Sequence, residues 1–137
     1  MATEFVQGGD LRHLMKSKKT FPEDAAKFII ANLILGLEFI HHNGILHRDI
    51  RPENILIAST GYLKICDFGL ARIWTPENST DSSGNPCYMA PEVLFKHNHT
   101  MTADYFSLGV IAHELMLGRK PYDVSTRDEY KEALKTQ

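Results

Sequence analysis

The sequence predicts a mainly α-helical domain that contains one short β-hairpin. Two long runs rich in apolar residues, 20–42 and 102–117, have the length and density of buried helices. Between them, short apolar runs at 55–57 and 63–66 flank the turn-forming residues 59–61, which is the pattern of a hairpin. The 43% hydrophobic content of the 137 residues is ordinary for a globular core, so we expect one packed domain or part of a larger one.

Charge and cysteine content exclude several classes of protein. The formal net charge of −2 offers no electrostatic footprint for nucleic acid or an anionic membrane. Cys66 and Cys87 form no disulfide framework, and no stretch resembles a signal peptide or a spanning helix. We therefore expect no nucleic-acid partner, no membrane segment and a reducing compartment, the cytoplasm or alternatively the nucleus.

The first half of the chain reads as two helices. Gly8-Gly9 breaks the chain before an amphipathic helix over residues 10–18. The sequence Thr-Phe-Pro-Glu at 20–23 then predicts a capping box that opens the long helix, whose apolar residues cover most of its circumference and predict burial. Asn43-Gly44 ends this helix. The adjacent His41 and His42 have no partner at metal-ligand spacing, and we interpret them as surface residues.

The stretch 47–54, His-Arg-Asp-Ile-Arg-Pro-Glu-Asn, is the most informative part of the chain. It is followed, across the predicted hairpin, by Asp67-Phe68-Gly69. Together they resemble the catalytic loop and the metal-binding motif of eukaryotic protein kinases. The resemblance implies that Asp49 accepts the proton of the attacking hydroxyl, that Arg51 meets the transferred phosphate, and that Asn54 and Asp67 hold Mg²⁺. His47 and Phe68 would have structural roles.

Two further signatures extend the resemblance over nearly the whole chain. Residues 84–92 end in Ala-Pro-Glu, as a kinase activation segment does, and residues 102–110 match the start of the central helix of the kinase large lobe. Details such as Gly9-Asp10-Leu11 are closest to the AGC-like serine/threonine kinases. The implied fold is a kinase-like large lobe, α+β in the intact kinase, in which Asp104 bonds to the catalytic-loop backbone. Gly118 would end the central helix, and residues 125–135 would begin one more polar helix.

The resemblance also implies a nucleotide site and a substrate class. ATP would contact the backbone of Glu4 and Val6, lie above Leu11 and meet Leu56 and Asp67. Cys66 would border this pocket, although we favour the alternative, a small buried hydrophobe. Protein substrates would carry arginines upstream of the phosphoacceptor, bound by three acidic residues, Asp10, Glu53 and Glu114.

Three positions in the catalytic loop and the activation segment differ from the family pattern. Asp81 stands where AGC-like kinases carry an activating phosphothreonine, and Arg48 and Arg72 match the basic residues that receive that phosphate. The alternative is that Asp81 is a solvated residue and that the phosphosite is Thr80 or Ser82, which lie beside Ser79 and Ser83. Arg51 replaces a lysine and Asn85 a threonine, in positions that should touch each other. We expect retuned activity rather than its loss.

The sequence contains no Gly-rich phosphate loop and no strand lysine before the stretch that resembles the hinge. The arginine that pairs in the family with the glutamate at the Glu92 position is also missing. We therefore expect residues 1–137 to be a partial kinase domain without the small lobe and the last large-lobe helices, and the isolated chain to be inactive. The alternatives are a kinase-like binding or scaffold module and a non-functional gene fragment. The Ala-Pro-Glu segment argues against a small-molecule phosphotransferase.

Overall fold

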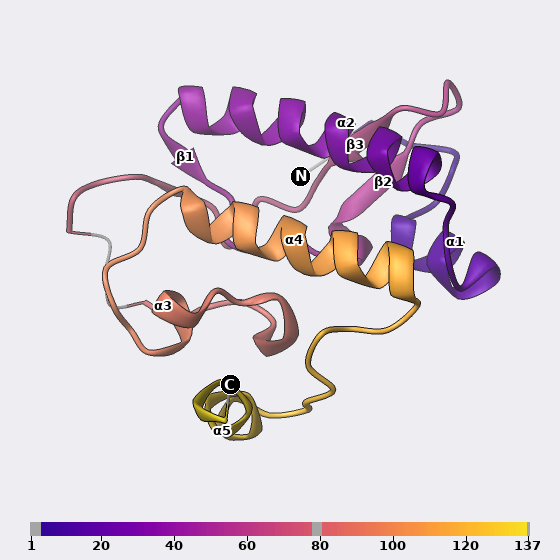
Figure 1. The fold of residues 1–137 in the computed structure, drawn as a ribbon. Helices are drawn as coiled ribbons and strands as arrows, with labels where there is room; N and C mark the ends of the chain where they lie inside the picture. The colour runs from indigo at the N-terminus through magenta and orange to yellow at the C-terminus, as the bar shows by residue number, and fades with distance from the viewer. Residues whose placement is uncertain (1–3, 78–80, 137) are drawn as a thin grey trace.

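Two long antiparallel helices, α2 (Glu23–His42) and α4 (Thr102–Leu117), lie side by side at the centre of the fold (Figure 1). The structure is a computed structural model and describes residues 4–77 and 81–136. At one end of the pair, the N–H of Phe21, just before α2, donates to the carbonyl oxygen of Leu115 over 2.9 Å. At the other end, His41 of α2 meets Asp104 of α4. Both ends of the pair are therefore joined by polar contacts.

A small hairpin packs beside α2. Its strands, β2 (Ile55–Ile57) and β3 (Leu63–Ile65), are antiparallel with Ile55 opposite Ile65. The Gly8-Gly9 stretch runs along β2, because the N–H of Gly8 donates to the carbonyl oxygen of Ile57 and the N–H of Ile57 to that of Gly9. A Cβ on Gly8 would lie 2.1 Å from the Ile57 oxygen, so only glycine allows this approach.

The remaining elements are short. A second antiparallel pair, β1 (Ile45–Leu46) with β4 (Arg72–Ile73), returns the chain after the hairpin to the start of the catalytic loop. The other helices are α1 (Leu11–Lys18), α3 (Pro91–Leu94) and α5 (Arg127–Lys135), with the 3₁₀ turns η1 (Pro52–Asn54) and η2 (Pro86–Tyr88).

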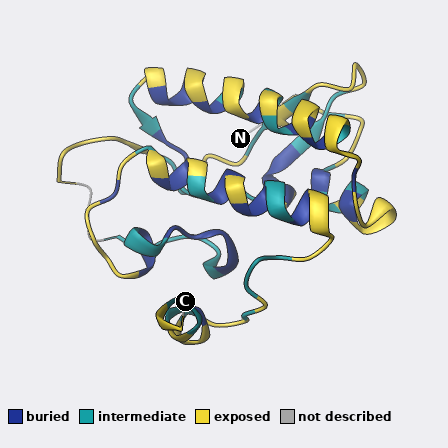
Figure 2. Cartoon of the chain, viewed as in Figure 1, coloured by how far each residue is buried: buried dark blue, intermediate teal, exposed yellow. Residues whose placement is uncertain are grey.

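The core lies between α2, α4, α1 and the hairpin, on the faces coloured as buried in Figure 2. Leu11, Leu37 and Leu115 have no exposed surface. A second cluster lies around α3 and α5, with Tyr130 fully buried and its hydroxyl donating to the carbonyl oxygen of Met89. The activation segment is thus attached to the large helices through its own small core.

The prediction of a mainly α-helical fold with a short hairpin is confirmed. Gly118 adopts the left-handed conformation (φ 69°) that ends α4, as predicted. The capping box predicted at 20–23 is wrong: α2 begins at Glu23 after Pro22, and no side chain caps it. A capping box forms instead at α5, between Thr126 and Glu129.

The expectation that both long helices are buried all round is also wrong. Phe28, Leu35 and Phe39 of α2 and Leu117 of α4 are exposed, so each helix buries one face only. Among the described residues, α2 alone has the length and apolar composition of a membrane-crossing helix. A helix that packs one face against a core passes the same test, and α2 packs in this way against α4.

Candidate active site

The catalytic loop is anchored from below by the carboxylate of Asp104, which is 1% exposed. One oxygen accepts the N–H of His47 (2.9 Å) and the other the N–H of Arg48 (2.8 Å). The Nε2 of His41 lies 2.8 Å from the first oxygen. These bonds hold Arg48 at a φ of 67°, a left-handed conformation that a residue with a side chain adopts only at a cost of about 1–3 kcal/mol. The predicted bond from Asp104 to the loop backbone is therefore present.

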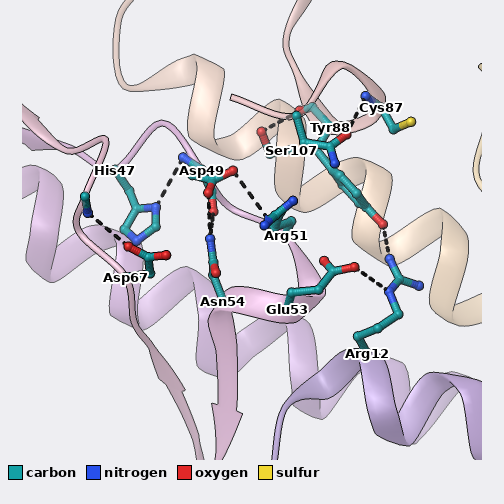
Figure 3. Close-up of polar contacts among 12 residues, drawn as sticks. Arg12, His47, Asp49, Arg51, Glu53, Asn54, Asp67, Cys87, Tyr88 and Ser107 are labelled. Atoms are coloured by element: carbon teal, nitrogen blue, oxygen red, sulfur yellow. Dashed lines mark hydrogen bonds and ion pairs between the residues drawn. The ribbon is translucent and has the colours of Figure 1, made fainter. Parts of the chain in front are cut away.

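The imidazole of His47 connects the two catalytic motifs. Its Nε2 lies 3.0 Å from the carbonyl oxygen of Cys66. Its Nδ1 lies 3.3 Å from the backbone nitrogen of Asp49, a contact drawn in Figure 3. One nitrogen must donate and the other accept, which requires the neutral ring. Burial lowers the pKa of His47 below its ordinary value and so favours this form. The ring of Phe68 packs edge-on against it, with 4.9 Å between centroids.

Asp49 and Asn54 form a fixed pair. The amide nitrogen of Asn54 donates to the Oδ2 of Asp49 (2.8 Å) and to its carbonyl oxygen (2.9 Å) (Figure 3). The Oδ1 of Asp49 faces the Nε of Arg51 at 3.6 Å, which is an ion-pair distance but too long for a hydrogen bond. The arrangement leaves Oδ1 as the oxygen of Asp49 that can accept a proton.

The residues predicted to bind Mg²⁺ fit a hard divalent cation. The side-chain nitrogen of Asn54 faces Asp49, so the side-chain oxygen of Asn54, Oδ1, remains for another partner. Asp67 is exposed, at a positive φ of 60°, and uses one carboxylate oxygen to accept the N–H of Gly69 (3.1 Å). Amide and carboxylate oxygens are the ligands that Mg²⁺ prefers. The described residues contain no cluster of three or more His, Cys, Asp or Glu that could hold a metal on its own.

The residues predicted to contact the nucleotide lie along one edge of the hairpin. Glu4 and Val6 precede the stretch that pairs with β2, and the carboxylate of Glu4 forms an ion pair with Lys64 of β3 at 2.9 Å. Leu56 and Cys66 are half-buried, so neither reading of Cys66 is excluded by its burial. Leu11 has no exposed surface and therefore lies beneath this edge rather than lining it.

Asp81 joins the activation segment to two arginines, as the sequence predicts. Its Oδ2 lies 3.2 Å from Arg48 and 2.8 Å from Arg72, and the hydrogen bond from Arg48 lowers the pKa of this carboxyl. Arg48 also donates to the carbonyl oxygen of Leu70 (2.7 Å). Thr80, one of the two alternative phosphosites, lies outside the described residues, as does its neighbour Ser79.

Two later residues of the segment were predicted to differ from the family: Asn85 in contact with Arg51, and Glu92 without its arginine partner. The side chain of Asn85 accepts the N–H of Cys87 (3.0 Å) and caps η2, so its hydrogen bond does not reach Arg51 as expected. Glu92 is half-buried and forms no ion pair with any residue that the structure describes.

The three acidic residues predicted to bind substrate arginines are not equally free. Asp10 accepts the N–H of His13 through one oxygen (2.8 Å) and caps α1. Glu53 and Glu114 already hold a guanidinium of the chain itself, that of Arg12. Both carboxylates are therefore occupied by Arg12 in this structure, and their contact with a substrate arginine stays a prediction.

Sequence reasoning missed Arg12 and misplaced His41. An arginine in the first turn of an amphipathic helix is expected to face solvent. No sequence motif links Arg12 to Glu114, which lies 102 residues later in the chain. His41, interpreted as a surface residue, is buried against Asp104. Its position four residues after the buried Leu37 puts it on the apolar stripe of α2, which was the available signal.

Comparison with known proteins agrees with this geometry. The protein kinase domain matches residues 1–137. The cAMP-dependent protein kinase catalytic subunit of Schizosaccharomyces pombe is 40% identical over 122 residues, 89% of this chain and 24% of that protein. A probable cAMP-dependent protein kinase catalytic subunit of Encephalitozoon cuniculi is 43% identical over 125 residues (91% and 38%). The cAMP-dependent protein kinase type 3 of Saccharomyces cerevisiae is 36% identical over 138 residues (100% and 34%). The chain thus spans between about a quarter and two fifths of these AGC-type relatives.

We predict that Asp104→Asn lowers the free energy of unfolding by about 1–3 kcal/mol, because its NH₂ group cannot accept the N–H of His47 and leaves that donor buried and unpaired. Urea denaturation measures the change. Asp123→Asn, at an exposed aspartate, is the matched control and should change the free energy by less than about 0.5 kcal/mol. Equal effects of the two substitutions would contradict the anchoring role of Asp104.

Proposed function

The chain belongs to the protein kinase domain family, and we propose that it carries the catalytic part of a serine/threonine kinase that transfers the γ-phosphate of ATP to protein hydroxyls. The observation that supports this most directly is the pair formed by Asp49 and Asn54 beside Asp67. Because the chain spans a fraction of its relatives, the activity belongs to the full-length protein. The inactivity expected of the 137 residues alone stays a prediction.

The pair of Asp49 and Asn54 suits general-base chemistry. Asn54 fixes the Asp49 side chain through Oδ2, so Oδ1 has one orientation. Oδ1 would accept the proton of the substrate hydroxyl as that hydroxyl attacks phosphorus. Arg51, 3.6 Å from this oxygen, is close enough to orient a phosphate oxygen, and its planar guanidinium replaces the point charge of a lysine.

The positions of Asn54 and Asp67 suit the holding of Mg²⁺. When bound, the ion neutralises charge on the transferred phosphate. The chain would present the side-chain oxygen Oδ1 of Asn54 and the carboxylate of Asp67, and the N–H of Gly69 positions the Asp67 side chain. His47 supports both motifs through Asp49 and the carbonyl oxygen of Cys66.

Protein substrates would carry a basic residue upstream of the phosphoacceptor. Asp10 supports this proposal, because only one of its oxygens has a recorded partner among the described residues. A charge-assisted bond from an arginine to such a carboxylate is stronger than a neutral hydrogen bond. The alternative, a kinase-like binding or scaffold module, would leave Asp49, Asn54 and Asp67 without a chemical role, so an activity measurement separates the two.

We predict that Asp49→Asn and Asp67→Asn, each in the full-length protein, lower kcat by at least about 100-fold. The first removes the proton acceptor, and the second removes a charged magnesium ligand. Transfer of radiolabel from ATP to a protein substrate measures the change, with Asp128→Asn, at a carboxylate whose side chain is 95% exposed, as control. Near-normal turnover in either variant would contradict the kinase proposal.

We also propose that Asp81 orders the activation segment without phosphorylation. Its carboxylate joins Arg48, which Asp104 holds, to Arg72 in β4. An aspartate brings one negative charge where a phosphate brings about −1.5 to −2 and three acceptor oxygens, so the ordering would be partial. Phosphate on Ser82 could add to it, since Arg127 of α5 donates to the Ser82 hydroxyl at 2.9 Å.

We predict that Asp81→Ala lowers the activity of unphosphorylated full-length protein about threefold to fivefold, because the ion pairs of a carboxylate that is 37% exposed are worth about 1 kcal/mol or less. Glu77→Ala, at an exposed acid of the same segment, should leave activity unchanged. If Asp81→Ala keeps full activity while phosphatase treatment of the wild type removes it, the phosphorylated hydroxyls are the switch and Asp81 is not.

A further inference from the structure

Arg12 fills an acidic recess beside the catalytic loop. The recess is made by Glu53 of η1, Glu114 of α4 and Tyr88 of η2, and Arg12 enters it from the first turn of α1. Its Nε donates to Glu53 over 2.9 Å and its Nη1 to Glu114 over 2.6 Å. Its Nη2 donates to the hydroxyl of Tyr88 and, over 3.3 Å, to the second oxygen of Glu114. One side chain thus joins four elements.

The contacts leave little capacity in the recess for a second cation. Arg12 uses four of its five N–H groups, and both oxygens of Glu114 are occupied, the second also by the hydroxyl of Tyr88 (2.6 Å). Lys120 lies over the Tyr88 ring, 5.4 Å from its centroid. Two carboxylates are therefore matched by two cations. Among the described residues, one oxygen of Glu53 is the carboxylate oxygen of the recess that has no hydrogen-bond donor.

Burial distinguishes these ion pairs from ordinary surface pairs. The exposed fractions of the side chains are 17% for Arg12, 10% for Glu114 and 40% for Glu53. Burial alone would raise the pKa of Glu114, but the hydrogen bonds from Arg12 and Tyr88 hold it below its ordinary value. Moving Arg12 out would take from the largely buried carboxylate of Glu114 its ion-pair partner at 2.6 Å, which is unfavourable. Arg12 is therefore a fixed occupant of the recess.

The recess lies where a substrate would pass. Glu53 directly precedes Asn54, which holds the catalytic Asp49, and Tyr88 ends η2, within the activation segment (Figure 3). On the other side of Tyr88, its carbonyl oxygen accepts the hydroxyl of Ser107 (2.6 Å), so this wall is rigid. A substrate side chain next to the phosphoacceptor would meet the recess with Arg12 already in it.

We propose that Arg12 is a specificity-determining residue that takes the place of a substrate arginine, so that the kinase accepts serine or threonine peptides with an uncharged residue facing this recess. The inference rests on the proposed kinase function and deepens it. It separates the two acidic sites: Asp10 still selects a basic residue, whereas the pair of Glu53 and Glu114 does not.

The test compares peptides that differ only in arginine or alanine at each upstream position, assayed with full-length wild type and Arg12→Ala. We expect the wild type to show, at the position that faces the recess, kcat/KM values within threefold for the two peptides. Arg12→Ala should prefer the arginine peptide at least tenfold there, because its guanidinium enters the emptied recess. Lys18→Ala, which removes an exposed charge from the same helix, should behave as the wild type.

A second variant and a binding measurement keep the test decisive if Arg12→Ala folds poorly. Glu53→Gln should leave the wild-type ratio unchanged, because Arg12 and not the peptide uses this carboxylate. Fluorescence anisotropy with the same peptides, their phosphoacceptor replaced by alanine, reads affinity without catalysis. Absence of transfer with any peptide would contradict the kinase function. A wild-type preference for arginine that Glu53→Gln abolishes, or equal affinity of Arg12→Ala for both peptides, would overturn the role of Arg12.

Discussion

The geometry of the loop at residues 47–54 depends on the buried carboxylate of Asp104. Its two oxygens accept the N–H groups of His47 and Arg48, and these bonds hold Arg48 in a left-handed backbone conformation. The carboxylate lies in the first turn of α4 and also contacts His41 at the end of α2. The loop is therefore held in a fixed position relative to the two longest helices. Preorganised catalysis requires this kind of support, because a small displacement of the base costs much of the rate.

Two arginines connect the loop and its surroundings to neighbouring elements. Arg48 forms an ion pair with Asp81 and donates to the carbonyl oxygen of Leu70, and these contacts position the activation segment relative to the loop. Arg12 does the same on the substrate side, where it joins α1 to η1, η2 and α4. Planar guanidinium groups suit this work, since one side chain can bond several acceptors at fixed angles. The contacts proposed for regulation and those proposed for substrate selection would then both depend on the same packed helices.

The sequence was sufficient for the fold class and for the parts of the site that depend on local order. The spacing from His47 to Asn54 and the hairpin before Asp67 sit on contiguous elements, and both were predicted. Contacts outside the family's motifs were not predicted: Arg12 meets Glu114 across 102 residues, and only folding reveals that Glu114 is occupied. His41 and Asn85 were misjudged for a related reason, because the acceptor or donor they find is set by packing and capping rather than by motif.

The central claim, that Asp104 fixes the catalytic loop, is tested most directly by hydrogen exchange of the two amides that it binds. If the account is right, the amides of His47 and Arg48 exchange only when the core of α2 and α4 opens, with protection close to that of the amide of buried Leu37. The amide of Thr60, in the exposed hairpin turn, should exchange rapidly. Exchange of His47 and Arg48 as fast as that of Thr60 would contradict the claim.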